Sequence, residues 1–292
     1  MVVLLPIDAS QASLRAAHWV AHYCGDRSAL RPLLLNVQRP PLQAWPDSVV
    51  GRKALEEALQ QQGLAIVEPV RTLLTEAGFE PETLVRLGHP SATILEVAEE
   101  HAARLVIMGT RGEGVLGGFA LGSVALRIAP AAQCPVVLVK PDAVLPTEWG
   151  VRLRVTAPLD GSVESTSAVR RLIELAGLLG SLHVNLVHFQ PALTLLEAVL
   201  PPHDDVLRSW SDREADEAIA TARQLLADAG ISHEVHRLAG EPATGIARFA
   251  EEHQAELIAM ATHGTGRILP AALGSVALKT AHLSRVPVAL MR

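Results

Sequence analysis

One stretch organises this chain: MGTRGEGVLGGFALGSV, at residues 108–124. It spaces Gly109, Gly112 and Gly122 by two and then nine residues, and Ser123 closes the pattern. The apolar run just before it, residues 105–108, is typical of a buried parallel strand, and residues 124–129 have the pattern of a helix. A glycine-rich loop between a strand and a helix N-terminus gathers backbone N–H groups and favours an anion such as phosphate.

A single glycine-rich loop is equally compatible with a tight connection that binds nothing. This loop, however, recurs in the chain at a constant offset of 152 residues. The same offset carries the segment PIDAS at residues 6–10 onto PLDGS at 158–162, and CPV at 134–136 onto VPV at 286–288. One offset that fits both ends of the repeat indicates a tandem duplication and therefore two domains.

Three motifs together resemble the universal stress protein family, in its tandem form with two copies in one polypeptide. They are the G-x2-G-x9-G-S loop, the P-I-D-A-S-x-x-S segment at residues 6–13 and the C-P-V-V-L-V segment at residues 134–139. The match covers both halves of the chain. We therefore expect a first domain at residues 1–140, a linker at 141–150 and a second domain at 151–292.

The composition agrees with two globular domains. Of the 292 residues, 49% are hydrophobic and only 3% aromatic, which predicts cores of Leu, Val, Ile and Ala. A formal charge of -6 gives no general attraction to nucleic acid or to an anionic membrane. We find no signal peptide or apolar run of about 20 residues, and expect a cytoplasmic protein without a membrane span. Cys24 and Cys134 lack metal-ligand spacing and are interpreted as buried free thiols.

The order of elements predicts two open, five-stranded parallel sheets with helices on both faces, a Rossmann-like α/β fold. In the first half we expect strands at 2–7, 33–37, 83–87, 105–108 and 135–139. Helices are expected at 10–22, 53–77, 92–101 and from 124, with a proline-rich loop at 40–46. In the second half we expect a loop at 190–210, a long helix at 211–229 and a strand at 231–238.

The resemblance implies an ATP site, or a site for another adenine nucleotide with or without Mg²⁺, in each half. It implies that Asp8 and the backbone of Val37 contact adenine, that Gly109 lies beside the ribose, and that the later glycines and Ser123 surround the phosphates. The expected first-half residues are Pro6, Asp8, Val37, Gly109, Gly112, Gly122, Ser123 and Val124. The second-half residues are Asp160, Phe189, Gly264, Gly274 and Ser275.

Other interpretations of these residues stay open. Asp8 and Asp160 can instead bond local backbone ahead of a helix, as aspartate often does. Arg111 can hold a phosphate or remain solvated, and His263 replaces it in the second half. Ala261 stands where the first half has Gly109, which predicts a weaker second site. The histidines at 18, 22, 89, 183, 188 and 233 lack paired metal-ligand spacing and are interpreted as surface or helix residues, and no metal site is predicted.

No catalytic set of nucleophile, base and orienting group is visible, so any ATP hydrolysis is expected to be slow. The Walker A sequence G-x4-G-K-[ST] is absent, and so is the S-G-G-x-D-S segment of ATP pyrophosphatases. The leading hypothesis is a stress protein that signals through a bound nucleotide. The alternatives are a slow nucleotide hydrolase that uses the same crevice, and an interaction module that has lost nucleotide binding.

The last strand of each half, residues 135–139 and 287–290, is apolar. An exposed apolar edge strand is a liability that proteins cover. In the resembling family the last strands of two subunits pair across a two-fold axis. We therefore expect the two halves to pack through these strands as an intramolecular pseudo-dimer, with association of whole chains into a homodimer as a further expectation.

Overall fold

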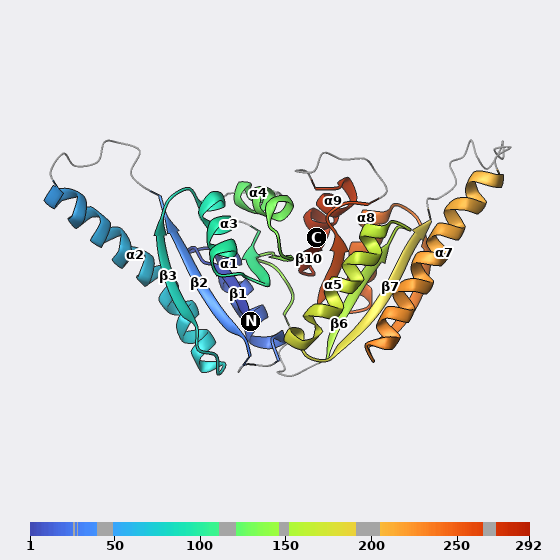
Figure 1. Cartoon of the computed structure of the whole chain (residues 1–292), viewed down its shortest axis with the longest axis horizontal. Helices are drawn as coiled ribbons and strands as arrows, with labels where there is room; N and C mark the ends of the chain where they lie inside the picture. Colours follow the sequence, from blue (N-terminus) through green and yellow to red (C-terminus); the bar gives the residue numbers. More distant parts are fainter. Residues whose placement is uncertain are drawn as a thin grey trace. The chain divides into compact units, whose positions relative to one another are not determined.

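The computed structural model describes residues 1–25, 27, 29–39, 49–110, 121–145, 152–190, 205–264 and 273–292. The chain divides into two compact units, Met1–Thr147 and Glu148–Arg292 (Figure 1). Within each unit, five parallel strands form a sheet with helices packed on it. The predicted α/β class is therefore confirmed.

The first unit alternates strands and helices in chain order. Its elements are β1 (Val2–Pro6), α1 (Gln11–Tyr23), β2 (Arg31–Gln38), α2 (Val49–Glu76), β3 (Glu82–Leu87), α3 (Pro90–Glu100), β4 (Leu105–Gly109), α4 (Ser123–Ala131) and β5 (Val136–Val139). The strands lie in the order β3-β2-β1-β4-β5, and every pairing is parallel. This is the order of a doubly wound sheet, whose strand order reverses between β1 and β4.

The second unit repeats the arrangement. Its elements are β6 (Leu153–Leu159), α5 (Val163–Leu179), β7 (Leu182–Gln190), α7 (Asp205–Asp228), β8 (Ser232–Ala239), α8 (Pro242–Glu252), β9 (Leu257–Ala261), α9 (Ser275–Leu283) and β10 (Val288–Met291). The strands lie in the order β10-β9-β6-β7-β8, again all parallel. The reversal falls between β6 and β9, the equivalents of β1 and β4.

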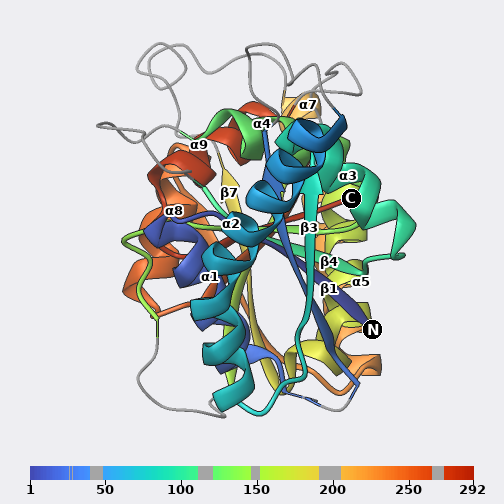
Figure 2. The ribbon, with the colours of Figure 1, turned by 90° about the vertical axis from the view of Figure 1, so that its left-hand side faces the viewer.

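The helices of the first unit form two packed pairs. α1 packs against α2, and α3 packs against α4, while α1 contacts β4 and α2 contacts β2 and β3. Figure 2 shows α2 running along the outer side of the first sheet. Because right-handed crossovers place consecutive helices on one face until the strand order reverses, α1 and α2 cover one face and α3 and α4 the other.

The core of the first unit is aliphatic and tightly packed. Val3, Leu4 and Leu5 of β1 are fully buried, as expected for a strand covered on both faces. Trp19 of α1 is also fully buried, and its ring centroid lies 5.2 Å from that of Tyr23. The centre of the sheet, beneath the ends of β1 and β4, is therefore a rigid platform.

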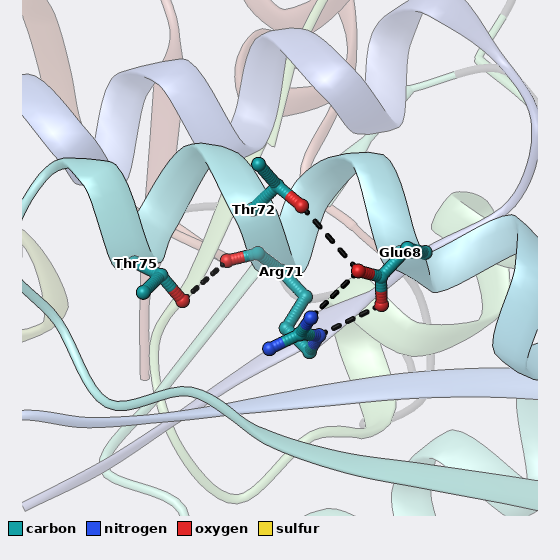
Figure 3. A network of polar contacts seen from close by, with 4 residues as sticks. All are labelled: Glu68, Arg71, Thr72 and Thr75. Carbon is teal, nitrogen blue, oxygen red and sulfur yellow. Dashed lines mark hydrogen bonds and ion pairs between the residues drawn. The ribbon is translucent and has the colours of Figure 1, made fainter.

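Helix α2 contains Pro69, which interrupts the backbone hydrogen bonds because proline has no N–H. Side chains bridge the same turn (Figure 3). Nε and one terminal nitrogen of Arg71 donate to the Glu68 carboxylate over 2.7 and 2.6 Å, and Thr75 Oγ1 donates to the Arg71 carbonyl over 2.8 Å. The hydrogen bond from Arg71 lowers the pKa of Glu68. The bridge is exposed, so its contribution to stability is small.

Both long helices begin earlier than the sequence pattern predicts. α2 starts at Val49 rather than at residue 53, and α7 starts at Asp205 rather than at 211. The prediction that a loop continues to residue 210 is therefore wrong at its C-terminal end. Each first turn closely follows a proline-containing segment, with Pro46 before α2 and Pro201 and Pro202 before α7, and such a segment favours a loop in the sequence. The predicted loop at 40–46 lies outside the described residues.

The two cysteines are free, but they differ in burial. Cys24 is buried as predicted, and burial raises the pKa of its thiol to about 12. Cys134 is half-buried, and burial raises the pKa of its thiol as well. Because the thiolate is the reactive form, both thiols are poorly reactive at neutral pH.

Candidate functional site

The candidate site lies where the strand order reverses. β1 and β4 are neighbours, with Val3 opposite Leu105 and Leu4 opposite Val106. Asp8 follows the end of β1, and the glycine-rich loop follows the end of β4. The carboxyl ends of both strands therefore meet at one edge, which is where open α/β sheets bind ligands.

Asp8 organises the start of α1. Its Oδ1 accepts a hydrogen bond from the Ser10 backbone N over 3.0 Å and another from the Ser10 hydroxyl. The Ser10 hydroxyl in turn accepts from the Ser13 backbone N over 3.2 Å, and the Ser13 hydroxyl donates to the Asp8 carbonyl over 2.6 Å. One carboxylate oxygen of Asp8 therefore bonds to groups next to it in the chain, which is the alternative interpretation of this residue.

The second unit repeats the first three of these hydrogen bonds. Asp160 Oδ1 accepts from the Ser162 backbone N over 3.0 Å and from the Ser162 hydroxyl. The Ser162 hydroxyl accepts from the Ser165 backbone N over 3.0 Å. Asp160 is exposed, whereas Asp8 is half-buried. The cap fixes each carboxylate at the edge of its sheet.

A buried side chain supports the residue before each aspartate. Asn36 of β2 donates from Nδ2 to the Ile7 carbonyl over 2.8 Å. At the equivalent place, His188 Nδ1 lies 2.9 Å from the Leu159 carbonyl. His188 is buried within β7, so its interpretation as a surface or helix histidine is wrong. The offset of 152 residues, which aligns His188 with Asn36, is the signal that could have identified it.

Each glycine-rich loop is closed at its base by one backbone hydrogen bond. The Gly122 N donates to the Thr110 carbonyl over 2.6 Å, and the Gly274 N donates to the Thr262 carbonyl over 2.8 Å. The Thr110 N donates to the Val139 carbonyl over 2.9 Å, which anchors that threonine to β5. The loops therefore leave and rejoin the sheet edge at one point. Gly112 and Arg111 lie outside the described residues.

Glycine is the N-cap of both helices that follow the loops. Gly122 has φ -65° and ψ 153°, and Gly274 has φ -59° and ψ 147°, without a side-chain cap in either case. The first N–H groups of an α-helix lack intrahelical partners, so those at the starts of α4 and α9 can bind an anion. Ser123 and Ser275 are exposed at these starts, and Val124 is half-buried.

The structure places Gly109 against α1. A Cβ added at Gly109 would lie 2.7 Å from both the carbonyl carbon and the Cβ of Ala12, and 2.8 Å from the Ser13 N. Neither Gly109 nor its counterpart Ala261 has a positive φ. Neither position therefore needs glycine for its backbone conformation, and the glycine at 109 is required by the close approach of α1.

In the second unit the structure brings two predicted site residues together. A Cβ added at Gly264, just after β9, would lie 2.1 Å from Oδ2 of Asp160, just after β6. Only glycine fits this approach without moving the carboxylate. Asp160 and the start of the second glycine-rich loop therefore line the same edge of the sheet.

The strand ends beside the aspartates differ between the units. Pro6 ends β1 opposite Leu35, and Val37 lies near the end of β2, where it is half-buried. Its counterpart Phe189 is 9% exposed, and a Cβ added at Gly245 of α8 would lie 2.2 Å from the Phe189 ring. The ring therefore packs directly onto the first turns of α8.

Charged groups beside the helix starts also differ. Glu241 caps α8, accepting from the Thr244 N over 2.9 Å, and pairs with Lys279 of α9 at 3.1 Å. The hydrogen bonds from Thr244, followed by the interaction with Lys279, lower the pKa of Glu241 to about 2. In the first unit His89 occupies this position, and its Nδ1 lies 3.2 Å from the Ser91 hydroxyl. Lys279 is thus partly neutralised in the second unit.

Among the described residues, no group of three or more His, Cys, Asp or Glu side chains could hold a metal ion. Within the same residues, no helix combines the length and the apolar character needed to cross a membrane.

His263, which aligns with Arg111, places its Nδ1 2.9 Å from the Thr262 hydroxyl. The polar groups at these edges are therefore backbone N–H groups, hydroxyls, carboxylates and imidazoles.

Comparison with known proteins agrees with this architecture. The model of the universal stress protein family matches residues 1–140 and again residues 152–292. A universal stress protein of Mycolicibacterium smegmatis is 26% identical over 303 residues, which covers 99% of this chain and 96% of that protein. One from Thermus aquaticus is 36% identical over 141 residues, or 47% of this chain and 97% of that protein.

A solved structure supports the fold over the whole chain. The crystal structure of a universal stress protein from Archaeoglobus fulgidus has a TM-score of 0.65 at 20% identity, covering 100% of this chain and 96% of that one. The repeated sheet and the repeated glycine motif define a tandem α/β protein with two copies of one architecture. The chain belongs to the universal stress protein family.

Proposed function

We propose that this protein binds ATP, or another adenine nucleotide, where the strand order reverses, and acts as a nucleotide-dependent regulator of the stress response. The observation that carries the proposal is the uncapped helix start after each glycine-rich loop, held beside an aspartate that follows a neighbouring strand. Uncapped N–H groups and the helix dipole favour phosphate there. Membership of the universal stress protein family supports the choice of an adenine nucleotide.

The proposed roles follow the chemistry of each group. An ionised carboxylate only accepts hydrogen bonds, so Asp8 suits the exocyclic amine of adenine. The N–H groups after Gly122 and the Ser123 hydroxyl suit the phosphates, and any Mg²⁺ would be held mainly by those phosphates. The proposed first site comprises Pro6, Asp8, Val37, Gly109, Gly112, Gly122, Ser123 and Val124. The proposed second site comprises Asp160, Phe189, Gly264, Gly274 and Ser275.

We further propose that the two copies are separate nucleotide-binding domains in a cytoplasmic protein. The proposed boundaries are residues 1–140 and 151–292, with 141–150 as the linker. The Ser10 and Ser162 hydroxyls, the serines nearest the aspartates in sequence, are engaged in helix caps. A hydroxyl used in this way is a poor nucleophile, which supports binding rather than rapid hydrolysis.

Gently purified protein is expected to carry ATP or AMP, because a site that binds through many preorganised N–H groups releases its ligand slowly. Native mass spectrometry followed by denaturation and analysis of the released small molecules measures this. Protein free of nucleotide that also gives no heat on titration with millimolar ATP would support the interaction module instead. Sustained phosphate release at enzyme-like rates with millimolar Mg²⁺ would support the hydrolase.

We also propose that the two units pack as an intramolecular pseudo-dimer through β5 and β10. Each strand is apolar and lies at one edge of its own five-stranded sheet. The carbonyls of Pro135 and Val139 accept from β4, so the intervening Val136 and Leu138 direct their N–H groups away from β4. A row of such groups on an apolar strand favours pairing with another strand.

Small-angle scattering of the dilute full-length chain is expected to give a radius of gyration of about 19 Å, the value for one compact body of this length. Two units joined like beads would give a distinctly larger value and two maxima in the distance distribution, which would contradict the pseudo-dimer. The mass obtained from the forward scattering reports at the same time whether whole chains associate into a homodimer.

A further inference from the structure

The outer strand of the second sheet, β8, contacts its neighbours through side chains that the first unit lacks. We call five residues the imidazole cluster: His183 and Asn185 of β7, His236 of β8, Phe249 of α8, and His253, which is the C-cap of α8. The equivalent residues of the first unit are Arg31, Leu33, Leu84, Val97 and His101. The aliphatic residues Leu33, Leu84 and Val97 are thus replaced by an amide, an imidazole and an aromatic ring.

His236 lies at the centre of the imidazole cluster. Its Nε2 is 3.2 Å from Oδ1 of Asn185, which is buried. Its ring centroid is 4.8 Å from that of Phe249 and 5.5 Å from that of His253. The Phe249 and His253 rings stack with centroids 3.7 Å apart and planes inclined by 15°. The imidazole therefore sits between β7, β8 and α8, where a neutral ring packs well.

The charged groups that face His236 disfavour its protonated form. Burial lowers its pKa most, the nearby His253 and His183 lower it further, and Glu234 opposes them. Glu234 Oε2 is 3.7 Å from His236 Nε2, but its side chain is 64% exposed, so solvent weakens this attraction. Two of the other charges on these elements have partners of their own: Arg237 pairs with Asp216 of α7, and Arg248 pairs with Glu252 within α8.

The sign of the pH effect follows from this direction. A folded-state pKa below the unfolded value of about 6.5 means that, as the pH falls through this range, the folded state binds fewer protons than the unfolded state does. The contribution of the cluster to stability is therefore complete above about pH 6.5 and is lost as the pH falls through the folded-state pKa. The loss of stability is expected to be local, because the described contacts of the His236 ring join β8 to β7 and to α8.

We propose that the imidazole cluster is an acid-sensitive switch that loosens β8 from α8 in the second unit in mildly acidic solution. Neutral His236 holds the two elements together, and its protonation places a positive charge beside His183 and His253 in a part-buried space. β3, which carries Leu84 at the same position, has no such switch. Because α8 packs against α9, acid also weakens the support of the second proposed site; this consequence alone rests on the proposed function.

Hydrogen–deuterium exchange of the full chain at pH 7.5 and pH 5.5, corrected for the intrinsic exchange rate, tests the switch. Protection of β8, residues 232–239, is expected to fall at least about threefold at the lower pH, because protonation of His236 favours the opened strand. Protection of β3, residues 82–87, is expected to change much less. An equal change in both strands would overturn the proposal.

The matched variant is His236→Leu combined with Asn185→Leu, which recreates the Leu84 and Leu33 pair of the first unit. It is expected to keep β8 protected at both pH values, whereas His233→Gln, a change on the same strand outside the cluster, is expected to keep the acid response. A full response in the double variant would overturn the proposal. If that variant does not fold, the NMR titration of His236 in the unaltered protein decides, because its midpoint must coincide with the loss of β8 protection.

His18 of α1 makes a strand-by-strand comparison necessary. Burial, followed by His22 and Arg15, lowers the pKa of His18, so the first unit has an acid-sensitive residue of its own. That residue lies on a helix that packs against α2, β4 and β5. Exchange resolved at β8 and β3 separates the two effects, whereas a single melting curve of the whole protein would combine them.

Discussion

The Gly122→Val variant is expected to lose ATP binding at the first site, by at least about a hundredfold in affinity, or about 2.7 kcal/mol. Valine would place two methyl groups at the start of α4, where the uncapped N–H groups of Ser123 and Val124 are proposed to meet the phosphates. Isothermal titration calorimetry with ATP measures the loss. Unchanged affinity in a folded variant would exclude this loop as the phosphate site.

The same variant is expected to remain folded. Gly122 has φ -65° and ψ 153°, a conformation that valine adopts readily, and its N–H bond to Thr110 needs no glycine. Circular dichroism and the melting temperature should therefore match those of the unaltered protein. A large drop in melting temperature would assign the loss of binding to unfolding, and Ser123→Ala would then replace it as the test of the phosphate contact.

Gly274→Val is the matched control, and we expect it to reduce total binding much less. Ala261 does not carry this ranking, because its backbone needs no positive φ. A difference in charge supports this ranking instead. The second unit has Glu164 in the first turn of α5, where the first unit has Ala12, and it has His263 in place of Arg111. Glu241 also pairs with Lys279. A greater loss from Gly274→Val than from Gly122→Val would contradict the ranking.

The sequence predicted the fold well because the repeat and the buried strands both leave clear patterns in it. The offset of 152 residues fixed the duplication, and short apolar runs such as residues 105–108 marked the buried parallel strands. The errors fall at element ends, where α2 and α7 begin soon after proline-containing segments. Proline in the sequence favours a loop, whereas the actual start of a helix also depends on tertiary packing.

The site was predicted less completely, because contacts between distant residues leave little trace in one sequence. The repeat motif singled out Asp8, which the structure places just after β1, and Gly122 and Ser123, which lie at the start of α4, the helix that follows the neighbouring strand β4. It did not reveal that Asn36 and His188 hold equivalent carbonyls, nor that His236 replaces Leu84 in the contact between β8 and α8. The offset aligns the members of each pair in the sequence, but the contacts that they make become visible only in the structure.

Gly109 shows how a motif residue can have a structural reason that the motif conceals. In the resembling family its position lies beside the ribose, yet here an added methyl would meet the backbone of Ala12 and Ser13 at 2.7 and 2.8 Å. Separations under 3.0 Å cannot be absorbed by rotating a side chain when the atoms are helix backbone, so α1 itself would have to move. A glycine retained only for a ligand would not show this contact.

Gly109→Ala is therefore expected to destabilise the first unit by about 1–3 kcal/mol, the usual cost of overpacking. Chemical denaturation with and without ATP measures it, and Ala261→Gly is the matched control. That control removes a methyl the second unit already accommodates, so its cost should stay below about 1 kcal/mol, that of a glycine replacing alanine. If Gly109→Ala instead kept full stability and lost only ATP affinity, the close approach to α1 would not be what requires glycine at residue 109. The glycine would then serve the nucleotide.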